Sequence, residues 1–253
     1  MSAPTLTSAV AVPRLLAEVA PAASLKVGGL TKFTATDFPG KLAAVVFVQG
    51  CPWRCGYCHN PHLQTRTAHS PLDWAQVLAL LQRRVGLIDA VVFSGGEPTI
   101  DAALEHAMVQ VRALGFATGL HTAGAYPRRL AQVLPLVDWV GMDVKTSFQG
   151  YDGITRISDS GRHALASAQA VLASGVAHEF RTTVHPELHT EHEILALART
   201  LSAMGVRHYA LQVFRSTGCA DEGLKTAATA GYPSAALLAQ LAALFTRFSL
   251  RRE

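Results

Sequence analysis

The chain has 253 residues, of which 49% are hydrophobic and 16% are charged, and its formal net charge is +4. This length allows one α/β domain with a well-buried core, and the composition excludes an intrinsically disordered chain. The basic residues are scattered, and their adjacent pairs are expected on solvated helix faces or helix ends, so we expect no nucleic-acid partner. These pairs are Arg83-Arg84, Arg128-Arg129 and Arg251-Arg252.

No apolar run reaches the roughly 18–20 residues that a membrane span requires, so we expect no membrane contact. Residues 1–24 are rich in Ala, Ser and Pro and lack the pattern of a signal peptide, so a poorly ordered extension is expected ahead of one domain at 25–253. The expected location is therefore the cytoplasm. Three of the four cysteines crowd into eight positions, which suits metal ligation in a reducing compartment better than disulfides.

From about residue 42 onward, short β-branched runs alternate with longer segments of helical period. Strands are predicted at 42–49, 90–93, 118–121, 137–144, 179–184 and 208–214. Helices are predicted at 73–85, 100–114, from about 127, and at 162–173, 191–204 and 234–248, with a polar loop at 145–159. The nearly continuous apolar strands favour a parallel sheet, and six units are too few for a complete eight-fold barrel. An open doubly wound sheet and a partial barrel both remain possible.

Unusual polar residues follow or end the predicted strands in turn. They are the cysteines, the segment 94–98, His121-Thr122, Asp143 with Lys145, Arg181 within the fifth strand, and Gln212 with Arg215. Parallel α/β folds place their functional sites at the carboxyl edge of the sheet. This clustering therefore predicts an active site at that edge.

The cysteine loop contains Cys51, Cys55 and Cys58, spaced so that one loop can supply three thiolates to three irons of a [4Fe–4S] cluster. One iron is then left without a protein ligand and is open to a substrate. Cys219 could be a fourth ligand, although a free cysteine is the simpler interpretation. The alternative is a zinc site made from three cysteines and His59, but neighbouring residues rarely both reach one tetrahedral metal.

The spacing Cys-x₃-Cys-x-aromatic-Cys, with Tyr57 as the aromatic residue, resembles the signature of the radical S-adenosylmethionine (SAM) enzymes. The segment Ser94-Gly95-Gly96-Glu97-Pro98 resembles that family's Gly-Gly-Glu-Pro motif, which binds the methionine amino group. The resemblance implies an α/β fold with parallel strands in a partial (β/α)6 TIM-like barrel. It also implies a reduced [4Fe–4S] cluster that cleaves SAM to methionine and a 5′-deoxyadenosyl radical, with a low-potential reductant such as a flavodoxin.

The flanking residues narrow the resemblance to activating enzymes of glycyl-radical enzymes, over roughly residues 25–220. The segments Gly28 to Thr34, Asp37 to Lys41 and Phe47 to Pro61 are most similar to the activase of anaerobic (class III) ribonucleoside-triphosphate reductase. Residues 142–145 resemble the Asp-x-Lys motif of those activases. Arg181, in the fifth predicted strand, stands where those activases carry an arginine. The resemblance implies that the residues around SAM are Tyr57, Gly95, Gly96, Glu97, Thr122, Asp143, Lys145 and Arg181.

The sequence differs from the activases of pyruvate formate-lyase at two places, and two alternative functions remain open. His121-Thr122-Ala123-Gly124 stands where activases of pyruvate formate-lyase have Asp-Thr-Asn-Gly, which puts their monovalent-cation site in doubt. Arg215 stands where those relatives end the sixth strand with a histidine. The other functions are a small-molecule radical enzyme such as 7-carboxy-7-deazaguanine synthase and a non-enzymatic iron–sulfur electron carrier.

Overall fold

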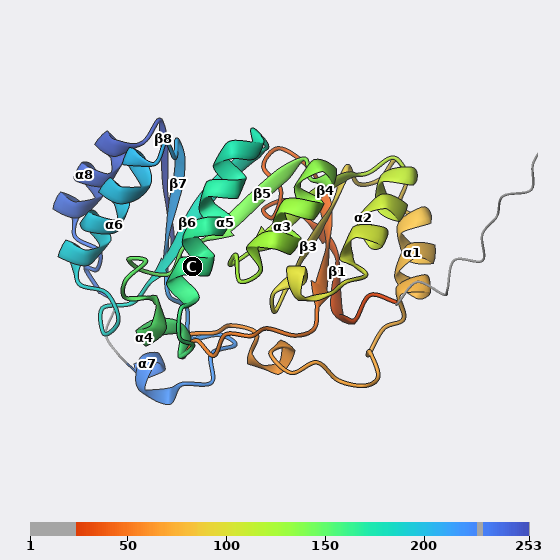
Figure 1. Ribbon diagram of the computed structural model, residues 1–253, viewed down its shortest axis with the longest axis horizontal. Helices are drawn as coiled ribbons and strands as arrows, with labels where there is room; N and C mark the ends of the chain where they lie inside the picture. Colours follow the sequence, from red (N-terminus) through yellow and green to blue (C-terminus); the bar gives the residue numbers. More distant parts are fainter. Residues whose placement is uncertain (1–23, 227–229, 253) are drawn as a thin grey trace, which may run out of the picture.

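The computed structural model describes residues 24–226 and 230–252, and these form a single eight-stranded sheet with the strands in chain order (Figure 1). The strands from β2 to β8 are parallel, whereas β1 runs antiparallel to β2. The strands are β1 Val27–Thr34, β2 Ala43–Val48, β3 Ala90–Gly95, β4 Ala117–Thr122, β5 Trp139–Asp143, β6 Ala177–Val184, β7 His208–Val213 and β8 Arg247–Arg251. A doubly wound sheet reverses its strand order, and this sheet does not. The chain therefore winds in one direction and forms the expected partial barrel.

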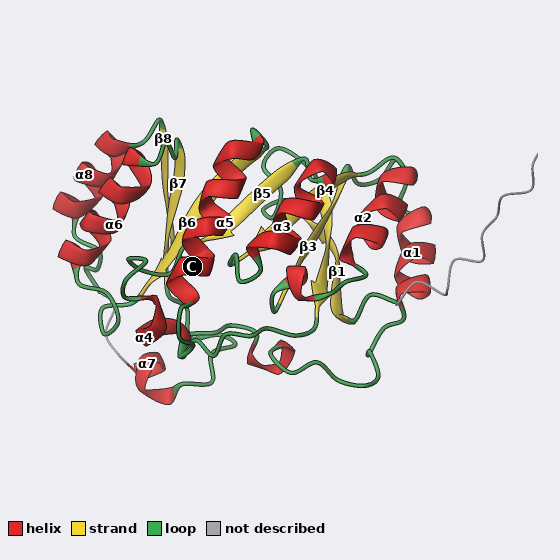
Figure 2. Ribbon diagram, in the orientation of Figure 1, coloured by secondary structure: helices red, strands yellow, loops and turns green. Residues whose placement is uncertain are grey.

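The helices α1, α2, α3, α5, α6 and α8 lie along one face of the sheet, and the short α4 and α7 lie near the edge where the parallel strands end (Figure 2). Their bounds are α1 Trp74–Gln82, α2 Leu104–Ala113, α3 Pro127–Val133, α4 Tyr151–Thr155, α5 Ser160–Ser174, α6 Glu191–Ala203, α7 Glu222–Thr226 and α8 Ala235–Leu244, with 3₁₀ turns η1 Pro61–Leu63, η2 Pro98–Ile100 and η3 Leu134–Leu136. Local signals fix several ends. Thr190 and Glu193 form a capping box at the start of α6, and Gly175 ends α5 with a φ of 71°.

Apolar side chains fill the barrel interior only at the end where the parallel strands begin. A small core cluster made of Phe38, Ala43, Val45, Ala90, Val92 and Trp139 closes the end where the parallel strands begin. Phe38 reaches this cluster from the loop between β1 and β2, and Gly119 leaves room for it because a Cβ there would lie 3.0 Å from the ring. Inward-facing positions nearer the carboxyl ends are polar. The half of the interior nearer the carboxyl ends of the parallel strands is therefore available for a functional site.

The structure corrects several details of the predicted elements. Strands β1 and β8 and helix α4 were not expected, and α4 lies within the supposed polar loop 145–159. The helix predicted at 234–248 is wrong at its end, because α8 stops at Leu244 and β8 begins at Arg247. Arg251 is therefore in a strand rather than at a helix end, and its guanidinium pairs with Glu179 at 2.7 Å. The helix predicted from residue 100 is preceded by the 3₁₀ turn η2 and begins at Leu104.

Two expectations concern the surroundings of the domain. The predicted extension at 1–24 falls, apart from Ser24, outside the residues that the structure describes. Among the described residues, no helix is both long enough and apolar enough to cross a membrane.

Candidate active site

A cavity of about 690 Å³ lies at the carboxyl edge of the sheet, where the polar residues of successive strands meet. The cysteine loop and the ends of β3 to β8 line it. Of the residues predicted to surround SAM, the cavity is lined by Tyr57, Gly95, Gly96, Thr122, Asp143, Lys145 and Arg181, together with Cys51, Cys55 and Cys58. Glu97 is the one predicted residue that lies behind the wall. The cavity volume is typical of a site for a small-molecule cofactor.

Backbone hydrogen bonds hold the cysteine loop against two neighbouring segments. The N–H of Cys51 donates to the carbonyl of Gln64 at 3.1 Å, and the N–H of Arg54 donates to the carbonyl of Thr155 at 2.8 Å. Trp53 is buried and makes an edge contact with Tyr151, with the ring centroids 5.6 Å apart. These contacts hold the loop in place, and α4 supplies part of its support.

The three cysteine thiols are free, half-buried and at the cavity wall. Burial, reinforced by the nearby Glu97 carboxylate, raises the pKa of Cys51 to about 12, and burial also raises the pKa of Cys55. Without metal the Cys51 and Cys55 thiols are protonated, so iron binding must release those protons. Three soft sulfur donors on one loop fit an iron–sulfur cluster chemically.

A site for one metal ion, unlike a site for an iron–sulfur cluster, requires several ligand side chains to converge on one point. Within residues 24–226 and 230–252, no three His, Cys, Asp or Glu side chains converge closely enough to hold one metal ion. A cubane cluster does not need such convergence, because each thiolate binds a different iron.

Gly95 and Gly96 form a part of the wall where backbone approaches backbone. Gly95 has a φ of 121°, and a Cβ there would lie 2.4 Å from the backbone nitrogen of Val48. A Cβ on Gly96 would lie 2.4 Å from the carbonyl oxygen of Gly50. Both positions therefore require glycine, and the resulting strand end exposes backbone polar groups to the cavity.

Glu97 is completely buried and acts as a clamp between the ends of β3 and β4. Its Oε1 accepts hydrogen bonds from the N–H and hydroxyl of Thr99 and, at 2.8 Å, from the hydroxyl of Thr122. Its Oε2 accepts from the N–H of Ala123 at 2.9 Å. The carboxylate thus shapes the wall that Thr122 and Ala123 present to the cavity. The sequence motif identified this residue, but not this arrangement.

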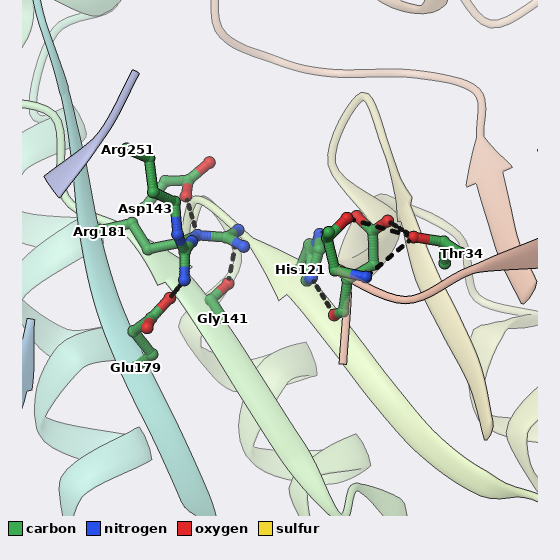
Figure 3. A network of polar contacts seen from close by, with 9 residues as sticks. Thr34, His121, Gly141, Asp143, Glu179, Arg181 and Arg251 are labelled. Carbon is green, nitrogen blue, oxygen red and sulfur yellow. Dashed lines mark hydrogen bonds and ion pairs between the residues drawn. The ribbon is translucent and has the colours of Figure 1, made fainter. Parts of the chain in front are cut away.

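Asp143 and Arg181 form an ion pair across adjacent strands (Figure 3). The guanidinium Nε donates to Asp143 Oδ1 at 2.8 Å, and Nη2 donates to the carbonyl of Gly141 at 3.3 Å. Burial alone would raise the pKa of Asp143, but the positive charges of Arg181 and Lys145 outweigh it and lower that pKa. Gly141 makes the pairing possible, because a Cβ there would lie 2.7 Å from Arg181 Nη1.

Lys145 lies just beyond the end of β5, with its ammonium over two aromatic rings. Nζ is 5.4 Å from the ring centroid of Tyr57 and 5.8 Å from that of Trp53. Burial disfavours the ammonium, but the neighbouring Tyr57, Cys55 and Asp143 raise the pKa of Lys145 well above its ordinary value. Lys145 is therefore a fixed positive charge in the cavity wall, suited to an anionic group of a ligand.

His121, near the end of β4, contacts the loop between β1 and β2. Figure 3 shows the His121 side chain among its polar contacts. Its Nε2 is 2.9 Å from the carbonyl oxygen of Asp37, and both residues line the cavity. Burial, together with the charge of Arg181, lowers the pKa of His121 to about 4, so the ring is neutral near pH 7. The sequence placed His121 at the site but did not indicate this contact.

Cys219 lies behind the cysteine loop and does not line the cavity. It is buried, and its thiol donates to the carbonyl of Gly56 at 3.5 Å. It packs with Tyr57, Phe214 and Leu224. The structure thus places it as a packing residue of the loop.

The family model described as "Radical SAM superfamily" matches residues 45–209. The chain belongs to the radical SAM superfamily. The cofactors of this family are a [4Fe–4S] cluster and SAM, and the thiols and cavity described above suit both.

Two sequence relatives and one solved structure illustrate the likeness. A candidate glycyl-radical enzyme activating enzyme of Methanocaldococcus jannaschii is 29% identical over 212 residues, covering 79% of this chain and 84% of that protein. The pyruvate formate-lyase-activating enzyme of Clostridium pasteurianum is 33% identical over 125 residues, covering 47% of this chain and 52% of that enzyme. The crystal structure of QueE from Escherichia coli superposes with a TM-score of 0.54 at 18% identity, covering 91% of this chain and 95% of that one. The last comparison shows a shared fold and no finer assignment.

Proposed function

We propose that this radical SAM enzyme activates a glycyl-radical enzyme, and that its partner is the anaerobic ribonucleoside-triphosphate reductase. The observation that carries the activase assignment is the similarity to the M. jannaschii protein over most of both chains. The choice of reductase rests on the resemblance of the segments around Cys51 to Cys58. The reaction is assigned to the reducing cytoplasm, with a flavodoxin or another low-potential donor as reductant.

In this proposal Cys51, Cys55 and Cys58 hold the [4Fe–4S] cluster as its three thiolate ligands. When bound and reduced, the cluster supplies the electron that cleaves SAM to methionine and a 5′-deoxyadenosyl radical. The residues of the chain then have separate tasks. At the strand end formed by Gly95 and Gly96, backbone carbonyls can accept hydrogen bonds from the ammonium group in the methionine part of SAM.

The charged residues orient the rest of SAM. Lys145 pairs with an anionic group and keeps its proton throughout, because its pKa is raised. Asp143, held ionised by Arg181, presents a carboxylate to hydroxyl or amine donors. Thr122 is oriented by Glu97, and Tyr57 packs beneath the Lys145 ammonium. In the proposed reaction a hydrogen atom passes from the α-carbon of a partner glycine to the 5′ carbon.

The test begins with the chain itself. The cluster is reconstituted anaerobically and reduced, SAM is added, and 5′-deoxyadenosine is measured; the Cys55→Ala variant is the control. Absence of 5′-deoxyadenosine from a fully loaded cluster refutes the radical chemistry in this chain. The host's anaerobic reductase is then added and an EPR spectrum is recorded, in which a glycyl doublet is expected.

The second part of the test separates the partner assignment from the chemistry. Formation of 5′-deoxyadenosine without a glycyl doublet removes the proposed partner and leaves the SAM cleavage standing. A small-molecule enzyme such as 7-carboxy-7-deazaguanine synthase would use the same two cofactors. Turnover of a pterin substrate, with no doublet on the reductase, would favour that alternative.

A further inference from the structure

A five-residue turn after β6, from His185 to His189, contacts the backbone of Lys145. Both histidines are buried, with 1% and 3% of their surface exposed. His189 Nε2 is 2.8 Å from the carbonyl oxygen of Lys145. The turn is anchored by Tyr232, whose hydroxyl donates to the carbonyl of His189 at 2.8 Å.

The contacts of His189 fix which ring nitrogen carries the proton. Its Nδ1 accepts the backbone N–H of His185 at 3.3 Å, so Nδ1 is unprotonated. A neutral ring then carries its proton on Nε2, which donates to the carbonyl of Lys145. Burial lowers the pKa of His189, which is consistent with this neutral form.

The peptide groups of Lys145 need such partners because the sheet does not supply them. Strand β5 ends at Asp143, and the last backbone contact with β6 is the N–H of Val144 donating to the carbonyl of Arg181 at 2.8 Å. One residue later, the N–H of Lys145 donates to the hydroxyl of Tyr151 at 2.9 Å. Side chains from α4 and from the turn after β6 thus replace the strand neighbours on both sides of Lys145.

We propose that His189 is a positioning residue, which holds the carbonyl of Lys145 and thereby keeps its ammonium at the cavity wall where an anionic group of SAM binds. This inference rests on the proposed role of Lys145 as a SAM contact. Without the His189 hydrogen bond, the Lys145 backbone is held on one side only. The ammonium then samples more positions over Tyr57 and Trp53, and ordering it costs affinity for SAM.

The test measures SAM affinity rather than turnover. The reconstituted chain with its cluster oxidised is dialysed anaerobically against labelled SAM, and iron content and urea unfolding are recorded for each variant. For His189→Leu we expect about tenfold weaker binding, equivalent to about 1.4 kcal/mol. His189→Gln retains a donor at the position of Nε2 and should bind within about threefold of the wild type.

A control histidine lies near the start of β6, at the opposite end of that strand from the turn that contains His189. His178 also contacts a backbone carbonyl, that of Val176 at 2.7 Å, but lies near the start of β6. His178→Leu should leave SAM affinity unchanged. An equal loss of affinity in this variant and in His189→Leu would overturn the proposal, because the loss would then be general. If His189→Leu does not load a cluster, His189→Asn replaces it, since its shorter amide does not reproduce the Nε2 donor.

A double-mutant cycle separates this inference from the proposed site. If Lys145→Ala leaves SAM affinity unchanged, the assignment of Lys145 itself is wrong. If Lys145→Ala weakens binding and His189→Leu does not, only the positioning role is overturned. When both weaken binding, the double variant should bind no more weakly than Lys145→Ala alone. Additive losses would mean that His189 acts independently of Lys145, which also overturns the inference.

Discussion

Replacing Glu97 by glutamine tests whether its carboxylate is a clamp within the protein or a direct ligand of SAM. The carboxylate accepts from two backbone N–H groups, those of Thr99 and Ala123, on different oxygens. Whichever way the glutamine amide is turned, its NH₂ group meets one of these N–H groups, and both can only donate. A hydrogen bond to a charged group contributes roughly 1.5–3 kcal/mol, and a buried unsatisfied donor costs roughly 1–3 kcal/mol. We therefore expect Glu97→Gln to lower the free energy of unfolding by about 2–4 kcal/mol.

The assay is urea unfolding of the cluster-free chain under reducing conditions, followed by circular dichroism. Glu105→Gln is the matched control, because Glu105 is exposed in the first turn of α2, and its effect should stay within about 1 kcal/mol. If Glu97→Gln is as stable as the wild type but binds SAM poorly, the clamp interpretation is refuted. The carboxylate would then contact the ligand directly.

Three further predictions address other parts of the site. Because the folded-state pKa of His121 is near 4 instead of 6.5, the native state resists protonation, and stability falls as the pH drops from 6.5 to 4. His121→Gln should remove about 3 kcal/mol of that pH dependence, measured by urea unfolding across this range; an unchanged slope would contradict the lowered pKa. Cys219→Ala should keep the iron and sulfide content of the wild type, whereas Cys55→Ala should not; loss of cluster in the former would make Cys219 a ligand. Gly141→Ala should displace the Arg181 guanidinium and weaken SAM binding about tenfold or more, and wild-type affinity would refute the close contact.

The sequence predicted the parallel core of the sheet well, because β2, β3 and β5 are short and mainly apolar and because helical segments alternate with the strands along the chain. It failed at both edges. β1 contains Gly28 and Gly29, which weaken its strand pattern, and its pairing with β2 depends on a contact that a local pattern cannot show. β8 follows the apolar α8 with no glycine or proline between them, so the helical pattern runs on to Phe248.

The candidate site was predictable where its residues belong to short, contiguous sequence motifs. The three cysteines, the glycines at 95 and 96, and the Asp143 to Lys145 segment all line the cavity. The supporting contacts were not predictable, because they join residues far apart in the chain. Thr122 reaches Glu97 across 25 positions, and His189 reaches Lys145 across 44. Such pairings depend on strand order and loop direction, which neither motif nor periodicity contains.

The sheet ends at β1 on one side and at β8 on the other, and among the described residues these two strands are not hydrogen-bonded to each other. A closed barrel has a diameter fixed by its strand number and stagger. An open arc has no such constraint, since small changes of twist at each strand pair add up across the sheet. The width of this cavity mouth is therefore not fixed by a closing β1–β8 hydrogen-bond ladder. Under the proposed function, the glycine segment of the partner would enter through this open side of the barrel.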